Sequence, residues 1–289
     1  MTRNALHRSV PVVVGLLALT ACGSDIPDGL IAEGSAAPAT PYTGPLRAKA
    51  PARGEDGRLR GGGAALLALE CAARPYEAGA AADEGAGDDG ADSAAGALAR
   101  YAGDGSEEMP VRGYRAEAGR GHRVLYSYDV AGRTRAAVVV AEDRRGWFAE
   151  TYASCDPSEF RARDRARLPV RVWEDAHGRA VSTAKVVSWR GAEHCDWQDV
   201  EFVTLDRGDD GRRRGRQYLR DARGVLADLD GLSSTYAEDV PLPSDAVDTG
   251  YRDAGRELWL APDRSRAYVR DADGTVERWP GTKEQVACQ

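Results

Sequence analysis

Five cysteines carry most of the chemistry that the side chains of this 289-residue sequence could perform. A cysteine thiol can be acylated, oxidised to a disulfide, bound to a metal or used as a nucleophile. Cys22 ends an apolar segment near the N-terminus, whereas the other four stand apart at Cys71, Cys155, Cys195 and Cys288. We therefore treat Cys22 as a residue with a local signal of its own, and the other four as candidates for pairing with one another.

The segment that leads to Cys22 is built like a secretory signal. Two arginines precede an uncharged run over residues 10–19, and Leu19-Thr20-Ala21 then lead directly to the cysteine. The run is too short for a helix that crosses a hydrocarbon core of about 30 Å. With small residues followed by cysteine, the segment resembles the lipobox of bacterial lipoproteins. That resemblance implies that residues 1–21 are a signal peptide and that Cys22, lipidated on its thiol, begins the mature chain.

The same resemblance implies where the protein resides. Two or more acyl chains, such as palmitate, at one residue are enough for stable membrane anchoring. We therefore expect a lipid-anchored, secreted protein on the outer face of the bacterial plasma membrane. The alternative is ordinary signal-peptide cleavage near Ala21, which would leave Cys22 as a free and exposed thiol.

The remaining four cysteines form an even set in a chain expected to be exported, which predicts two disulfides. We favour Cys71–Cys155 with Cys195–Cys288, because each bond then closes one half of the chain and the two do not cross. None of the four lies in a short-spaced pair. The spacing therefore predicts neither a zinc site nor a thioredoxin-like redox site, and we expect no metal and no cofactor.

Two motifs could supply a nucleophile. Ser182 and Lys185 match the Ser-x-x-Lys pattern of penicillin-binding proteins and serine β-lactamases, which requires the serine at the start of a helix. The flanking valines favour a strand, which would place the two side chains on opposite faces. His194 adjoins Cys195, but neighbouring residues in a strand point apart and the cysteine count places Cys195 in a disulfide. Neither motif predicts a catalytic residue.

Carboxylates and aromatic residues are the other groups that could form a site. The aspartate pairs at residues 209–210, 228–230 and 271–273 lack the spacing of a calcium-binding EF-hand and are better explained as turn formers. The second half of the sequence gathers Trp173, Trp189, Trp197, Trp259, Trp279, Tyr218, Tyr236, Tyr251 and Tyr268. These groups suit either a ligand surface or a core, and we favour the core because exposed aromatic patches are uncommon.

Charge and composition narrow the class of partner. Removing residues 1–21 leaves 37 basic and 46 acidic residues, a net charge near −9, which repels nucleic acid and anionic lipid headgroups. The excess of Ala, Arg, Gly and Asp is consistent with a GC-rich genome. Residues 146–160, 194–205 and 249–280 look like stretches of exported actinobacterial proteins. This resemblance implies an extracytoplasmic globular module without implying an activity.

The pattern of apolar residues predicts an α+β fold that is mostly antiparallel β. A flexible tether over residues 22–63 leads to an α+β lobe over residues 64–167 and a β-rich lobe over residues 168–289. In the first lobe we expect helices at 64–73 and 93–102, a mobile acidic loop at 77–92, a three-stranded meander over 124–155 and a short helix capped by Asp156. In the second lobe we expect strands at 170–173, 181–189, 200–205, 217–219, 257–260, 267–269 and 276–279.

These observations favour a membrane-anchored, non-catalytic module that binds a protein, peptide or glycan of the cell envelope. The alternative is a cell-envelope hydrolase whose site is assembled from carboxylates on loops. A hydrolase should show a cleft with converging Asp or Glu and a shifted pKa, whereas a binding module should show an aromatic surface patch. A transporter's substrate-binding lipoprotein is a third alternative, but the sequence lacks the helices of that class. The oligomeric state stays open.

Overall fold

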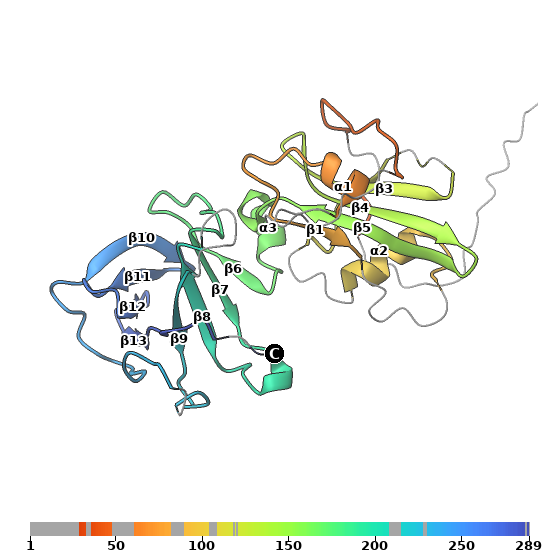
Figure 1. The fold of residues 1–289 in the computed structure, drawn as a ribbon. Helices are drawn as coiled ribbons and strands as arrows, with labels where there is room; N and C mark the ends of the chain where they lie inside the picture. The colour runs from red at the N-terminus through yellow and green to blue at the C-terminus, as the bar shows by residue number, and fades with distance from the viewer. Residues whose placement is uncertain are drawn as a thin grey trace, which may run out of the picture.

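The computed structural model describes residues 29–32, 36–47, 61–81, 90–103, 109–117, 119, 121–207, 215–227, 230–286 and 288. The expected signal segment and Cys22 lie outside the described residues. Antiparallel sheets dominate the described part, with few helices, which confirms the predicted α+β, mostly β fold class. Two lobes follow one another along the chain, the first coloured orange to green and the second green to blue (Figure 1).

The first lobe is built on one antiparallel sheet with a helix on each face. In spatial order its strands are β1 (Glu77–Ala80), β5 (Gly146–Ser154), β4 (Arg133–Asp143), β3 (Arg123–Val130) and β2 (Tyr114–Ala116). Helix α1 (Gly63–Leu67) lies on one face and α2 (Ala94–Gly103) on the other (Figure 1). The meander β3–β4–β5 is the predicted one.

The valine run of β4 explains why both faces are covered. Successive residues of a strand point to opposite faces, so a continuous apolar run requires a cover on each side. Val138 and Val140 pack in the cluster that contains Leu98 of α2, and Val139 packs in the cluster that contains Ala65 of α1. All of these side chains are buried.

Several segments of the first lobe differ from the prediction. Helix α1 ends at Leu67 instead of reaching residue 73, because the backbone of Glu70 pairs with Thr134 of β4 (Glu70 N to Thr134 O, 2.9 Å) and the chain there follows the sheet. The segment predicted as a mobile acidic loop begins with a strand, β1, and residues 82–89 of it lie outside the described part.

The expected tether also differs where the structure describes it. Leu30 is fully buried in the core beside α2, and Ile31 forms a parallel bridge with Tyr114 of β2. Tyr42 and Leu46 pack against the cluster under α1. These parts of residues 22–63 therefore belong to the folded lobe, because their apolar side chains are buried there. For the residues that are not described, the tether stays a prediction.

The second lobe is a sandwich of two four-stranded antiparallel sheets. The first sheet contains β6 (Val170–Val172), β7 (Val186–Arg190), β8 (Glu201–Leu205) and β9 (Arg216–Arg220). The second contains β10 (Val247–Asp253), β11 (Arg256–Leu260), β12 (Arg266–Arg270) and β13 (Val276–Pro280). Figure 1 shows the blue second sheet beside the green-to-teal first sheet. Each strand except β10 lies within or beside a predicted segment.

Both edges of the sandwich are joined by backbone pairing. Glu174, just after β6, exchanges two hydrogen bonds with Arg252 of β10, at 2.7 and 2.8 Å. At the other edge Tyr218 of β9 is bridged to Gly281, and Thr282 N donates to Gln217 O at 2.9 Å. The enclosed core contains Trp173 and Trp279, which are fully buried. The eight strands thus form a filled sandwich whose two sheets are bridged at both edges.

The segment between the lobes begins as predicted. Asp156 caps the 3-10 helix η1 (Pro157–Glu159) by accepting a hydrogen bond from Ser158 N at 2.9 Å, and a proline occupies the first turn. The short helix α3 (Ala162–Arg165) follows and leads into β6. Among the described residues, none of the helices has the length and apolar character needed to span a membrane.

Candidate functional site

Charged residues gather at one end of the sandwich, where β9 and β12 end and β8, β11 and β13 begin. We call this set the charged rim, and its members are Glu201, Arg220, Asp253, Arg256, Asp271 and Glu277. Alternation along the strands positions them. Glu201, Arg256 and Glu277 each lie two residues before a core residue, respectively Val203, Leu258 and Trp279. Each therefore points to the same face as that core residue, at the end of the buried stripe.

Glu277 is the centre of one half of the charged rim. Its side chain is about nine-tenths buried and accepts hydrogen bonds from Arg220 Nε (2.8 and 3.0 Å), the Tyr236 hydroxyl (2.8 Å) and Trp279 Nε1 (2.8 Å). Burial, and then the hydrogen bond to Glu277, raise the pKa of Tyr236, so this phenol stays a donor. Three different donors thus hold the Glu277 carboxylate in one position.

Arg256 is the centre of the other half. Its guanidinium donates to both carboxylate oxygens of Glu201, at 3.1 and 2.9 Å, and also contacts Asp253. It lies over the ring of Trp173, 5.7 Å from the centroid. Burial opposes the charge of Arg256, but the hydrogen bonds that it donates to Glu201 and Asp253 outweigh this effect and raise the pKa of Arg256. This bidentate arrangement fixes the guanidinium in one geometry.

Asp271 is the exception within the charged rim. Its carboxylate is partly buried and has no hydrogen-bond partner among the residues that the structure describes. Burial, and then repulsion from Glu277, raise the pKa of Asp271, while Arg256 and Arg220 act in the opposite sense. An unpaired carboxylate in this setting favours a bound cation or a proton more strongly than an aspartate in water does.

Asp273, in the same hairpin, behaves as the turn former that the sequence predicts. Its carboxylate accepts a hydrogen bond from Thr275 N at 2.9 Å, and this bond lowers the pKa of Asp273. The prediction that these aspartates form turns is therefore right for Asp273. For Asp271 it does not explain a carboxylate that is partly buried and has a raised pKa. One signal could have separated them: Asp271 follows the buried Val269 by two positions, so it lies on the interior face. Residues 209, 210 and 228 of the other aspartate pairs lie outside the described part.

The Ser-x-x-Lys motif takes a conformation different from the predicted strand. Residues 183–185 form a turn, closed by Lys185 N donating to Ser182 O at 2.9 Å, and β7 begins only at Val186. The strand prediction over 181–185 is wrong because this segment turns toward Asp156, in the segment between the two lobes, and hydrogen-bonds to its carboxylate. There the Ser182 hydroxyl donates to Asp156 at 2.9 Å, while Lys185 is exposed.

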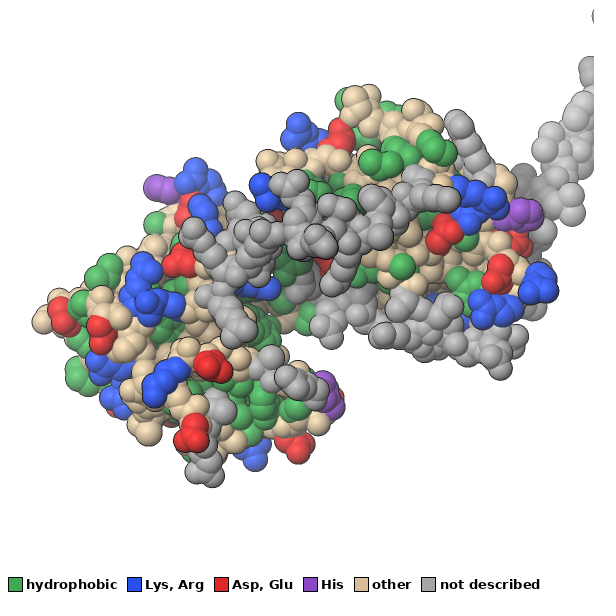
Figure 2. All heavy atoms as spheres, viewed as in Figure 1, with side chains coloured by type: hydrophobic (Ala, Val, Ile, Leu, Met, Phe, Trp, Pro, Cys, Tyr) green, Lys and Arg blue, Asp and Glu red, His purple; other side chains and the backbone are tan. Residues whose placement is uncertain are grey.

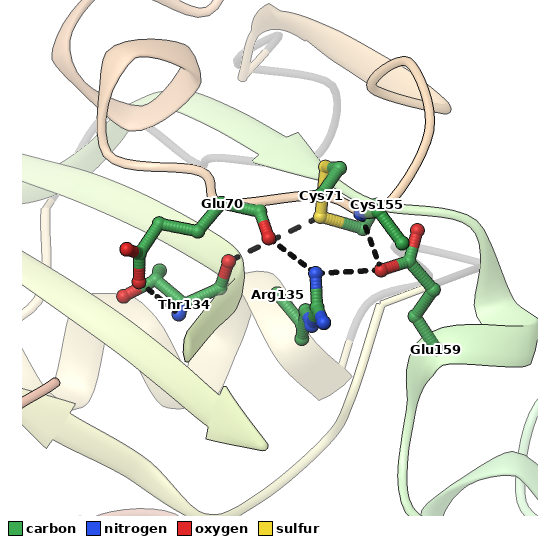
Figure 3. Close-up of a disulfide and its surroundings, with 7 residues drawn as sticks. Glu70, Cys71, Thr134, Arg135, Cys155 and Glu159 are labelled. Carbon is green, nitrogen blue, oxygen red and sulfur yellow. Dashed lines mark hydrogen bonds and ion pairs between the residues drawn. A yellow bond between two sulfur atoms is a disulfide. The ribbon is translucent and has the colours of Figure 1, made fainter. Parts of the chain in front are cut away.

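The four paired cysteines follow the favoured scheme. Cys71 is bonded to Cys155, with a Cα–Cα distance of 5.3 Å, and Cys195 is bonded to Cys288, with a Cα–Cα distance of 6.3 Å. Figure 3 shows the first disulfide among Glu70, Thr134, Arg135 and Glu159.

Around this first disulfide the charges are paired. Arg135 bridges the Glu159 carboxylate at 2.6 Å and the Glu70 carbonyl, and Ala72 N donates to Glu159 at 2.9 Å (Figure 3). Two sets of potential metal ligands cluster within 4.8 Å among the described residues, but each contains one of the disulfides, whose sulfurs are not thiolates.

The aromatic residues mostly form core, as favoured from the sequence. Trp173, Trp279, Tyr218 and Tyr268 are buried. Trp189 and Trp197 pack around the buried Phe202, on the outer side of the first sheet of the sandwich. The large hydrophobic side chains that are exposed among the described residues are Leu67, Val225 and Val247, none of them aromatic. An aromatic binding patch is therefore not present in the described part.

The surface charges are mixed in sign. Figure 2 shows basic and acidic side chains interspersed on the visible face of the β-rich lobe, without a continuous basic stripe. No protein-family model matches this sequence, and no curated protein or solved structure is significantly similar to it.

Proposed function

We propose that the protein is a non-catalytic binding module, anchored by a lipid on Cys22 to the outer face of a bacterial plasma membrane, and that it binds its partner at the charged rim. The observation that carries the binding assignment is the carboxylate of Asp271, which has no hydrogen-bond partner among the described residues, whereas the carboxylates of Glu201 and Glu277 accept hydrogen bonds from arginines. We infer a protein or peptide partner that presents a lysine or arginine side chain.

The chemistry of the charged rim supports a basic partner group. Hydrogen bonds hold Glu277 and Arg256 in place before a partner arrives, so little side-chain entropy is lost on binding. A cation that reaches Asp271 would relieve its repulsion from Glu277. A glycan would more often require exposed aromatic rings, and the described residues present none. The acidic mature chain also favours a basic partner.

The test compares two substitutions that remove the same charge from one hairpin. Asp271→Asn and the control Asp273→Asn are expressed in native membranes, and partners are captured by crosslinking and identified by mass spectrometry. Loss of one hydrogen bond between charged groups costs about 1.5–3 kcal/mol, so Asp271→Asn should weaken capture at least about tenfold. Asp273→Asn should leave capture unchanged. Equal capture by wild type and Asp271→Asn would remove the rim assignment.

The anchor has its own test, independent of the rim. Cys22→Ala should abolish incorporation of a labelled fatty acid and release the protein from the membrane fraction. Inhibition of lipoprotein signal peptidase should cause the precursor to accumulate. A mature N-terminus without a lipid on Cys22 would contradict the anchoring proposal and leave the rim assignment intact.

The cell-envelope hydrolase stays the second candidate, because Asp271 faces Glu277 and has a raised pKa. The hydrogen bonds of Glu277 to three donors argue against it as the second member of an acid–base pair. Incubation with cell-wall fragments, peptides and esters separates the two proposals. Turnover that is lost in Asp271→Asn and retained in Asp273→Asn would favour the hydrolase.

A further inference from the structure

The disulfide between Cys195 and Cys288 lies next to a histidine. Cys195 ends the 3-10 helix η2 (Glu193–Cys195) in the loop between β7 and β8, and the C-terminal segment brings Cys288 to it. Nε2 of His194 lies 3.1 Å from Sγ of Cys288. His194 is exposed, and both cysteines are partly exposed. A thiol in solution can therefore approach this disulfide.

The chain contains a second disulfide with the opposite environment. Cys155 is fully buried, and the sulfurs of Cys71 and Cys155 lie within 4.8 Å of the carboxylate of Glu159 (Figure 3). A carboxylate disfavours a thiolate beside it, whereas an imidazole N–H favours one. The two disulfides should therefore differ in their reactivity toward thiols.

We propose that Cys195–Cys288 is a thiol–disulfide exchange site for a dithiol reductant, with His194 as the proton donor to the leaving sulfur. The external thiolate attacks Sγ of Cys195 and forms a mixed disulfide. The Cys195–Cys288 bond breaks, and its electron pair passes to Cys288, which takes the proton from Nε2 of the imidazolium form of His194 and leaves a neutral imidazole. Attack on Cys195 is preferred because only Cys288 has the imidazole contact among the described groups.

The second thiol of the same reductant completes the exchange. It attacks the reductant's own sulfur in the mixed disulfide, which releases Cys195 as a thiolate that takes a proton from water. The reductant leaves as a disulfide, oxidised by two electrons, and the protein gains two thiols. The C-terminal segment is then held by its other contacts, which include two hydrogen bonds between Gln217 and the backbone of Val286, at 3.2 and 2.8 Å.

The test uses the full-length protein and dithiothreitol as the dithiol. Aliquots are quenched with an alkylating reagent, and modification of the four cysteines is followed by peptide mass spectrometry. Cys195 and Cys288 should react at least about tenfold faster than Cys71 and Cys155. His194→Ala should slow the first pair by about tenfold and leave the second pair unchanged. His122→Ala, which removes an exposed histidine of the first lobe, is the control and should change neither rate.

A second measurement identifies which sulfur is attacked. Glutathione has a single thiol, so the mixed disulfide can be trapped by a rapid quench before a second glutathione attacks it, and the trapped adduct should be on Cys195 in the wild-type protein. His194→Ala should make the adduct distribute between Cys195 and Cys288. Three outcomes would overturn the proposal: a glutathione adduct mainly on Cys288, an unchanged rate in His194→Ala, or equal reduction of the two disulfides.

Discussion

The carboxylate of Asp156 accepts a hydrogen bond from the hydroxyl of Thr183 at 2.8 Å, and this bond joins the two lobes. The same carboxylate accepts from Thr183 N (3.1 Å), from the Ser182 hydroxyl (2.9 Å) and from Ser158 N (2.9 Å). Asp156 is about 95% buried. The Asp156 side chain thus caps η1, just after the meander, and its hydrogen bonds to Ser182 and Thr183 hold the turn that precedes β7.

Asp156→Ala should destabilise the protein, because Thr183 N and the Thr183 hydroxyl would be buried without an acceptor. We expect a loss of about 2–4 kcal/mol in the free energy of unfolding, measured by urea denaturation. Ser182→Ala removes a single donor and should cost about 1 kcal/mol. Equal effects of the two substitutions would contradict the role of Asp156 as the shared acceptor.

Glu277→Ala should also be strongly destabilising, because it leaves Arg220, Tyr236 and Trp279 without their common acceptor. Tyr236 and Trp279 each lose an acceptor, at about 1–3 kcal/mol, whereas the Arg220 side chain is 34% exposed and can be solvated, so the Tm should fall by several degrees. The matched control is Glu238→Ala, since Glu238 contacts the same Arg220 and Tyr236 but is mostly exposed. This control should change stability by less than about 1 kcal/mol.

Asp271→Asn should stabilise the protein at neutral pH, with a pH dependence whose sign is fixed by the raised pKa of Asp271. The folded state binds this proton more tightly than the unfolded state, so wild-type stability falls as pH rises from the unfolded pKa through the folded pKa. The substitution removes that loss, and its benefit should vanish below the ordinary aspartate pKa. Urea denaturation over a pH series measures the difference.

Asp273→Asn is the control of opposite sign in the same hairpin. The pKa of Asp273 is lowered by its hydrogen bond from Thr275 N, so its contribution is present at neutral pH and is lost as pH falls through the folded pKa. Asp273→Asn should therefore destabilise at neutral pH and have no effect in acid. If the unfolding free energies of the two variants changed with pH in the same way, Asp271 would not have the raised pKa that this prediction requires.

Replacing both Cys71 and Cys155 by serine should destabilise the first lobe. The bond closes a loop with a sequence separation of 84 residues, which is worth about 4–5 kcal/mol if chain entropy dominates. The buried position of Cys155 adds to the cost of a serine there. Thermal unfolding of the double variant against wild type measures the effect. An unchanged Tm would show that the sheet and the Arg135–Glu159 pair suffice to hold this region.

The fold was most predictable where strand-forming residues are concentrated between turn residues. The meander over 124–155 and the strands that end at Leu205 and Leu260 follow from this pattern, because valine, aromatic and other apolar residues run through them and glycine or aspartate lies near their ends. Strand β10 gives no such signal. All of its residues are exposed or partly buried, and its register shifts between Asp248 and Tyr251, where Gly250 has a φ of +76°.

The candidate site was less predictable, because it depends on strands that meet only in the folded chain. Glu201 and Glu277 lie far apart in the sequence, and nothing near either residue indicates that they share one end of a sandwich. The turn over 183–185 was hidden for the same reason: its conformation depends on Asp156, which lies in the other lobe. The cysteine pairing needed no such information, because the count and order of the residues favoured it.

The bridges between the two sheets of the sandwich affect how readily crowded copies of the protein can associate through their strands. An open sheet presents a row of unpaired N–H and C=O groups, to which a neighbouring chain can add a strand. Here the pairing of Glu174 with Arg252 and of Tyr218 with Gly281 satisfies backbone groups at one position on each edge of the sandwich. Copies that crowd together, as they would if tethered to a common surface, therefore meet fewer free backbone groups at these edges than two unbridged sheets would present.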